Sequence, residues 1–214
     1  MLQNIPLFSV LAANELNALA SHAVTKTYPK NSVIINEGDH TDSLYVILSG
    51  KVKIFLTDEQ QREVIVDIQR PGDYFGELAL LDEAPRLASV MTLESSQFLI
   101  ISKAQFKKCL ADYPEIAFRL IKGLTQRLRA TTENVKSLAL MDVYGRIART
   151  LLQMAQENDE GQVINEKLTH QDIANMVGAS REMVSRIMKD LAKGGYISSE
   201  GKRILIKEKL PPGW

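Results

Sequence analysis

The sequence has a single cysteine, Cys109, so several classes of protein are excluded at the outset. One cysteine cannot form an intrachain disulfide framework, and it cannot build a zinc or iron–sulfur site from several thiolates. No apolar run approaches the roughly 18 residues that span a bilayer. Residues 1–16 lack the basic start and apolar core of a signal peptide. We therefore expect a cytoplasmic protein with no membrane partner.

The sequence also lacks net charge, because 26 Lys and Arg balance 26 Asp and Glu over 214 residues. The balance conceals an asymmetry. Residues 1–112 carry 10 Lys and Arg against 14 Asp and Glu, whereas residues 113–214 carry 16 against 12. A difference in sign between the two halves of a chain favours a basic module, such as one that binds nucleic acid, in the basic half.

Residues 26–102 have the pattern of an antiparallel β domain. Short apolar runs alternate with turns rich in Gly, Pro and Asp, and the predicted strands are 32–35, 44–50, 51–56, 63–68, 88–93 and 97–102. Closely spaced short strands of this kind are typical of a sandwich, barrel or roll. Leu11, Leu16 and Leu19 fall at helical spacing, which predicts a small helix within residues 1–20.

Two helices are predicted next, a short one over 103–111 and a long one from Pro114 to about residue 140. Positions of one helical face recur in steps of four and three, at Ala117, Ile121, Leu124, Leu128, Thr131, Val135 and Leu138, and all of them except Thr131 are apolar. Such a heptad seam is typical of a two-stranded coiled coil and predicts a homodimer. The alternative is that this helix packs on its own sheet.

Residues 169–191 have the spacing of a helix-turn-helix. Thr169 and Asp172 form a capping-box start for a helix over about 170–176. Gly178 stands where a left-handed residue would end that helix, and Ser180 then caps a second one.

The elements around this motif are expected to complete a winged module. Asp142 is predicted to cap a helix over about 143–156. Residues 157–162 are expected to form a solvated loop. Residues 194–206 predict a two-stranded hairpin, the wing, with its turn at about 199–202.

The second helix of the motif divides into an apolar and a polar face at 100° per residue. The polar face carries Arg181, Glu182, Ser185, Arg186 and Lys189. Arginine forks pair with O6 and N7 of guanine, and glutamate accepts from N4 of cytosine. A polar helix face is more often merely solvated, but the preceding turn favours a recognition helix in the major groove. Lys202 in the hairpin turn would contact phosphates.

Residues 71–90 contain a glycine turn, a one-turn apolar segment, Pro-Arg and a predicted strand. Glu77 and Arg86 are the charged residues of this segment that suit a buried site. Glu77 could accept a hydrogen bond from a ribose hydroxyl, and Arg86 could bind a phosphate together with backbone N–H groups. The plainer alternative is a surface salt bridge.

The stretch GELALLDEAPRLASV (76–90) resembles the phosphate-binding cassette of cyclic-nucleotide-binding domains. With the long helix and SREMVSRIMKDL (180–191), the chain resembles the Crp/Fnr family of bacterial transcription regulators over residues 5–210. The resemblance implies an α+β fold in three parts: a cyclic-nucleotide-binding β-roll (1–112), a dimerisation helix and hinge (113–140), and a winged helix-turn-helix (141–214). It also implies a regulator rather than an enzyme, and no nucleophile–base pair or metal cluster supports catalysis.

The resemblance assigns roles to individual residues. Cyclic AMP, the expected effector, would be bound by Gly76, Glu77, Leu78, Ala79, Arg86, Leu87, Thr131 and Thr132. Palindromic double-stranded DNA would be contacted by Thr169, Ser180, Arg181, Glu182, Ser185, Arg186, Lys189 and Lys202. Leu87 stands where cyclic-AMP binders usually carry a small or hydroxyl-bearing residue. The alternative is therefore the same DNA-binding regulator with a different effector, or with none.

Overall fold

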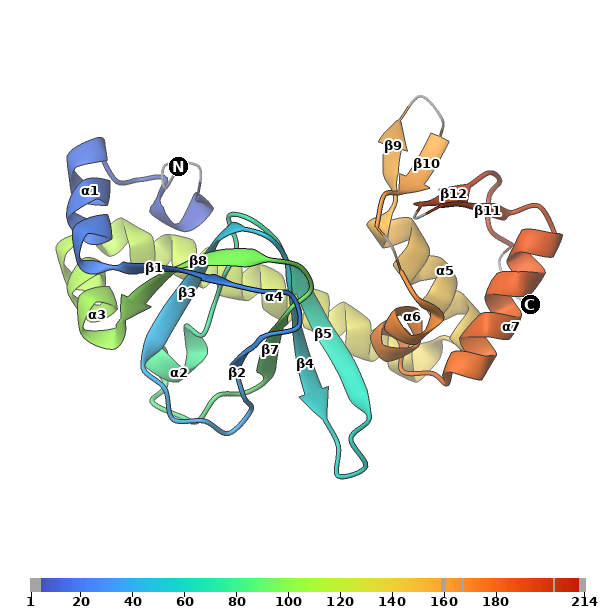
Figure 1. Ribbon diagram of the computed structural model, residues 1–214, viewed down its shortest axis with the longest axis horizontal. Coiled ribbons are helices and arrows are strands. Elements are labelled where there is room, and N and C mark those ends of the chain that lie inside the picture. Colours follow the sequence, from blue (N-terminus) through green and yellow to red (C-terminus); the bar gives the residue numbers. More distant parts are fainter. Residues whose placement is uncertain (1–4, 159–160, 167, 202, 212–214) are drawn as a thin grey trace. The chain divides into compact units, whose positions relative to one another are not determined.

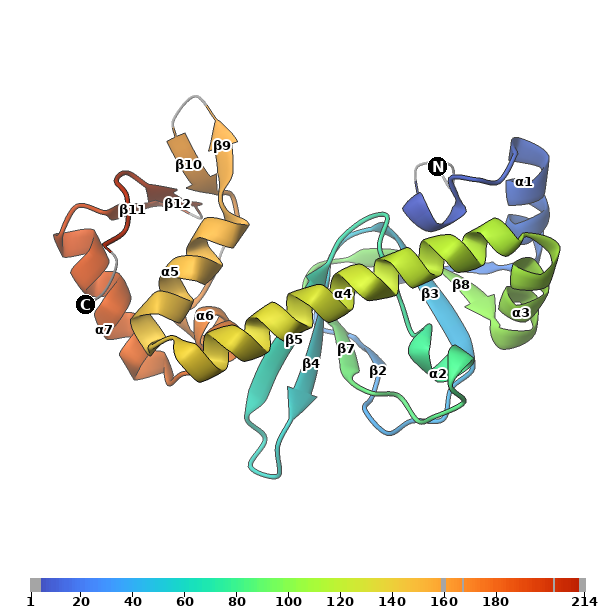
Figure 2. The ribbon, with the colours of Figure 1, turned by 180° about the vertical axis from the view of Figure 1, so that it is seen from behind.

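The computed structural model describes residues 5–158, 161–166, 168–201 and 203–211 (Figures 1 and 2). The chain divides into two compact units, Met1–Arg129 and Ala130–Trp214. Helix α4 (Pro114–Leu140) contributes its first part to one unit and its last turns to the other. The predicted α+β fold is confirmed, whereas the division at residues 112 and 140 stays a prediction.

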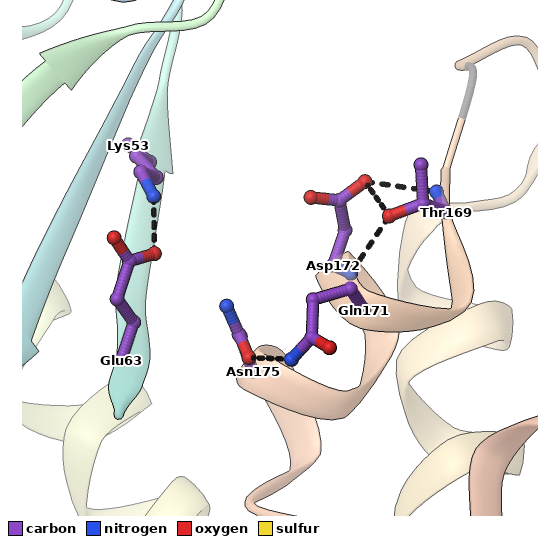
Figure 3. Close-up of polar contacts among 6 residues, drawn as sticks. All are labelled: Lys53, Glu63, Thr169, Gln171, Asp172 and Asn175. Atoms are coloured by element: carbon purple, nitrogen blue, oxygen red, sulfur yellow. Dashed lines mark hydrogen bonds and ion pairs between the residues drawn. The ribbon is translucent and has the colours of Figure 1, made fainter. Parts of the chain in front are cut away.

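The first unit is a β-roll flanked by helices. Its strands are β1 (Val24–Tyr28), β2 (Val33–Ile35), β3 (Ser43–Ser49), β4 (Val52–Thr57), β5 (Glu63–Gln69), β6 (Tyr74–Phe75), β7 (Ser89–Thr92) and β8 (Ser96–Ser102). They form two antiparallel sheets, in the orders β1-β8-β3-β6 and β2-β7-β4-β5. The six predicted strands are therefore confirmed, and β1 and β6 are additional. Lys53 and Glu63 form an ion pair between β4 and β5 (Figure 3).

Helices pack against the β1-β8-β3-β6 sheet of this roll. They are α1 (Ala13–His22), α2 (Leu78–Leu81), α3 (Lys103–Asp112) and the start of α4, and a 3-10 turn (Pro6–Phe8) precedes them. Figure 2 shows the first part of α4 running along the roll beside α3. Ile116 and Leu120 of α4 are buried in one cluster with Leu44 and Val46 of β3. This packing fixes the first turns of α4 against the sheet that ends at β6.

An aromatic cluster inside the roll holds β6 in place. The ring of Phe75 stacks on Tyr45 with centroids 5.0 Å apart and meets Phe98 edge-on at 5.5 Å. Both arrangements are favourable for aromatic quadrupoles. Because β6 leads directly into residues 76 and 77, the cluster also fixes the start of the candidate cassette.

The second unit packs three helices with a sheet. They are α5 (Val143–Met154), α6 (His170–Val177) and α7 (Arg181–Lys193), and the strands are β9 (Gln156–Asn158), β10 (Gly161–Ile164), β11 (Ile197–Glu200) and β12 (Arg203–Ile206). The strand order is β11-β12-β10-β9, and Figure 1 shows the sheet beside the helices. Apolar faces of all three helices enter one core, through Ile147, Leu151, Ile173, Val184 and Leu191 among others.

The expectation of a loop over 157–162 is wrong, although the described residues of this segment are exposed as expected. Strands β9 and β10 lie there, and β10 pairs with β12 of the predicted wing, so the hairpin is part of a larger sheet. Val163 and Ile164 are fully buried, and this burial orders the segment. The preceding helix consequently ends at Met154 rather than at residue 156. Residues 159 and 160 lie outside the described residues.

The helix-turn-helix forms where its capping residues predict. The hydroxyl of Thr169 accepts from the backbone N–H of Asp172, whose carboxylate accepts from the N–H of Thr169 at 2.8 Å (Figure 3). Gly178 ends α6 with φ of 62°, and the Ser180 hydroxyl then accepts from the N–H of Met183 at 3.2 Å. Asp142 caps α5 in the same manner, through the N–H of Gly145.

Substitution of Gly178 by alanine should destabilise the second unit by about 1–2 kcal/mol, because an L-residue in the left-handed region is strained by that amount. The added methyl would also lie 3.4 Å from Cδ2 of Leu138. Urea denaturation of the full chain measures the loss. Asparagine tolerates this conformation better, so Gly178→Asn should lose clearly less. Equal losses in the two variants would exclude backbone strain as the cause.

Candidate functional site

Arg86 lies at the centre of the candidate cassette and is buried, with 3% of its surface exposed. Its Nε donates to Oγ1 of Thr41 at 2.7 Å, and its two terminal nitrogens donate to the carbonyls of Gly76 at 2.6 Å and Ser43 at 2.8 Å. A guanidinium has five N–H groups. The described residues occupy three of them, which leaves one N–H on each terminal nitrogen. Burial lowers the pKa of Arg86.

Gly76 makes this arrangement possible. Its φ is 85°, and a Cβ there would lie 2.6 Å from a terminal nitrogen of Arg86 and 2.9 Å from the carbonyl oxygen of Ser43. Any larger residue would therefore displace the guanidinium. Glycine is required here both by the backbone conformation and by the close approach of the arginine.

Glu77 is also buried, with 2% of its surface exposed, and its partner is Arg127 of α4 rather than Arg86. A terminal nitrogen of Arg127 lies 2.6 Å from Oε1 of Glu77, and the other donates to the carbonyl of Tyr74 at 2.6 Å. Burial raises the pKa of Glu77, and the Arg127 charge opposes this shift. The alternative of a surface salt bridge between Glu77 and Arg86 is thus wrong.

The remaining cassette residues differ in exposure. Ala79 is buried, whereas Leu78 and Leu87 are 38% and 68% exposed. The N–H groups of Leu78 and Ala79 begin the one-turn helix α2 and have no carbonyl partner within it. Thr131 and Thr132 are exposed on α4, in the second unit.

The predicted recognition helix α7 presents its charged residues to solvent. Arg181, Glu182, Arg186 and Lys189 are exposed and Ser185 is half-buried, while Val184, Ile187, Met188 and Leu191 are buried. Arg181, Glu182 and Lys189 have no ion-pair partner among the residues that the structure describes. A hollow of about 470 Å³ lies beside Arg181, lined also by Leu168, Thr169, His170 and Gln171. A basic side chain at the start of α7 therefore borders a concave surface.

The two capping hydroxyls are not equally available to a ligand. The Thr169 hydroxyl donates to the Asp172 carboxylate at 2.6 Å (Figure 3), so a contact with DNA through this proton would have to replace that bond. The Ser180 hydroxyl accepts from Met183 and keeps its own proton for another acceptor. Lys202 lies outside the described residues.

The predicted seam of α4 is only partly used within the chain. Leu124 packs against the first core, but Ile121, Leu128, Val135 and Leu138 are between 52% and 67% exposed. Ile116 and Leu120, which are outside the seam, form the face that contacts the roll. The first part of the helix therefore packs on the first unit through one face, and the helix presents an apolar stripe on another face.

Comparison with known proteins agrees with this architecture. A model of the cyclic nucleotide-binding domain matches residues 25–113, and a model of the Crp-like helix-turn-helix domain matches residues 145–209. The CRP-like cAMP-activated global transcriptional regulator of Mycobacterium tuberculosis is 36% identical over 94% of this chain and 92% of its own length. The chain belongs to the Crp/Fnr family of transcription regulators.

Two further proteins are similar to this chain over most of their length. The cAMP-activated global transcriptional regulator CRP of Salmonella typhimurium is 38% identical over 87% of this chain and 90% of its own. The c-di-GMP responsive regulator CLP of Xanthomonas campestris has a similar structure, with a TM-score of 0.81 and 26% identity over 92% of this chain and 100% of its own. These relatives are regulators, and the chain is a DNA-binding transcription regulator with a cyclic-nucleotide-binding domain. In the described residues, no helix has the length and apolarity needed to cross a membrane.

Sequence reasoning missed one residue of the candidate site. The sequence pattern does not single out Arg127, yet its guanidinium donates to Glu77, which lies 50 positions away in sequence. Because the sequence places Leu124 in the seam, it gives no signal that the following turn of the helix faces the roll.

Proposed function

We propose that the chain acts as a homodimer whose binding to palindromic DNA is controlled by a cyclic nucleotide, with cyclic AMP as the first candidate. The buried guanidinium of Arg86 supports this, because it retains two N–H groups for a ligand beside the buried Glu77. A buried arginine with unused donors is the group expected to bind a phosphate.

The chemistry of a cyclic nucleotide matches the groups of the cassette. The cyclic phosphate would accept from Arg86 and from the N–H groups that begin α2. The 2′-hydroxyl would donate to Glu77. The hydroxyls of Thr131 and Thr132 would contact the adenine edge, which explains a polar residue within an otherwise apolar seam.

A second candidate is the same regulator with another effector. Leu87 follows Arg86, is 68% exposed, and offers no side-chain donor to a phosphate. One structural relative is described as responsive to c-di-GMP. Thermal shift with cyclic AMP, cyclic GMP and c-di-GMP separates the candidates, because a true ligand stabilises the folded protein by mass action.

The exposed stripe of α4 supports the homodimer. A row of large apolar side chains at heptad spacing is typical of a coiled-coil interface and costly to leave in water. Replacement of Val135, 59% exposed, by aspartate should therefore produce monomers at micromolar concentration. Light scattering measures the mass, and Lys136→Asp serves as a neighbouring control off the seam. A dimeric Val135→Asp protein would contradict a seam interface.

In such a dimer the two α7 helices would enter successive major grooves about 34 Å apart, as helix-turn-helix dimers do. Arg181, Glu182, Ser185 and Arg186 would read or flank base edges, and Thr169, Ser180, Lys189 and Lys202 would lie near phosphates. RNA polymerase is the expected protein partner, and the cytoplasm is the expected location. In-vitro selection of DNA with and without cyclic AMP tests the proposal, since failure to enrich any palindrome would refute it.

A further inference from the structure

Arg146 of α5 bonds to the backbone at two separate helix ends. One terminal nitrogen donates to the carbonyl of Met141, the residue that follows α4, at 2.9 Å. Its Nε donates to the carbonyl of Val177, the last residue of α6, at 2.8 Å, and its other terminal nitrogen donates to the carbonyl of Gly178 at 3.4 Å. All of these atoms belong to the second unit.

The bonded carbonyls are ones that helices leave unsatisfied. The last carbonyls of an α-helix have no partner within it, and they carry the negative end of the helix dipole. A guanidinium satisfies several of them at once through charge-assisted hydrogen bonds, and its planar fork fixes their relative positions. Arg146 therefore joins the end of α4 to the turn between α6 and α7.

Two further contacts hold the same junction. Leu138 of α4 packs against Gly178, where an added methyl would lie 3.4 Å from Cδ2 of Leu138. Arg149, one turn after Arg146, donates to the carbonyl of Glu133 at 2.8 Å. The last turns of α4, the first turns of α5 and the helix-turn-helix turn are thus packed together.

We propose that Arg146 is a positioning residue that transmits the state of α4 to the recognition helix α7. The turn that it holds ends at Ser180, the cap of α7, so a displacement of the end of α4 reaches the first turn of α7 through this guanidinium. The inference rests on the proposed function, in which a ligand shifts α4 between two states. Without Arg146 the ligand would still bind, but the DNA affinity would no longer follow it.

The test measures DNA affinity of the full-length protein with and without saturating cyclic AMP, by fluorescence anisotropy on a selected site. The ratio of the two dissociation constants is the readout. We expect Arg146→Gln to reduce this ratio at least about tenfold relative to wild type, within the usual range of allosteric coupling. Calorimetry should show cyclic AMP binding retained. Arg146→Lys keeps the charge but cannot span both helix ends, so it should lose most of the ratio as well.

The controls separate positioning from folding and from charge. Lys209→Gln removes an exposed charge of the second unit and should leave the ratio unchanged. Circular dichroism checks that each variant is folded, and if Arg146→Gln is not, Arg146→Lys carries the test. A ratio within threefold of wild type in a folded variant, or DNA binding weakened equally with and without cyclic AMP, would overturn the inference. A wild-type protein indifferent to cyclic AMP would instead overturn the proposed function, and the inference with it.

Discussion

Replacement of Arg86 by alanine should weaken cyclic-nucleotide binding at least about a hundredfold. Each hydrogen bond to a charged group contributes about 1.5–3 kcal/mol, and the alanine variant loses two such bonds to the phosphate. Because the site is buried, the phosphate would also lose the positive charge that offsets its desolvation. Isothermal titration calorimetry with cyclic AMP measures the change directly.

The same substitution has a structural cost that must be separated from the loss of binding. Alanine leaves the carbonyls of Gly76 and Ser43 without the donors that Arg86 supplies, so the melting temperature of the first unit should fall. Arg86→Lys restores the charge without the fork and should bind more tightly than the alanine variant. Arg62→Ala, at an exposed ion pair with Asp58, is the matched control and should bind normally. Near-normal affinity in a folded Arg86→Ala protein would place the ligand elsewhere.

The sequence predicts which residues form this site better than it predicts their hydrogen-bond partners. Glu77 and Arg86 stand out as the charged residues of 71–90 that suit a buried site, and both are indeed buried. Their partners could not be found in the same way. Arg86 bonds to Ser43 on a strand 43 positions away, and Glu77 bonds to Arg127 on α4. Such contacts depend on how the roll closes and on where α4 packs. Neither can be predicted from the local spacing of apolar residues.

Strands β9 and β1 show a second limit of prediction from sequence. Every residue of β9 is exposed, and only the last residue of β1 is partly buried, so neither strand has an apolar alternation to detect. Their backbone pairing with β10 and β8 orders them instead. In contrast, β3, β4 and β8 bury apolar side chains and lie within one or two residues of their predicted bounds.

The long helix was predicted correctly, but its two apolar faces could not be assigned from spacing. Ile116 and Leu120 are four residues apart and pack on the roll, while Ile121, Leu128 and Val135 are seven apart and exposed. Both patterns fit a helix of 3.6 residues per turn. The two interpretations offered by the sequence, packing on its own sheet and a seam for a partner, thus concern different faces of one helix.

Replacement of Arg181 by alanine should remove base preference at one position of each DNA half-site. Arg181 begins α7, is exposed, and has no ion-pair partner among the described residues, so its fork is available to guanine. One bidentate pair discriminates by about 1–3 kcal/mol, and a dimer applies that difference twice on a palindrome. The preference for the selected site over one mutated at both positions should fall by about 2–6 kcal/mol. Competition gel shifts on the two sites measure it.

Replacement of Lys189 by alanine is the comparison that distinguishes base reading from phosphate contact. Lys189 lies two turns further along the same face, is exposed, and as a point charge suits a phosphate rather than a base edge. Lys189→Ala should weaken both DNA sites equally and lower the slope of log affinity against log salt by about one per protomer. Arg181→Ala should instead change the ratio between the sites. If both variants changed only the salt slope, α7 would contact the backbone without reading sequence, and specificity would have to come from DNA shape.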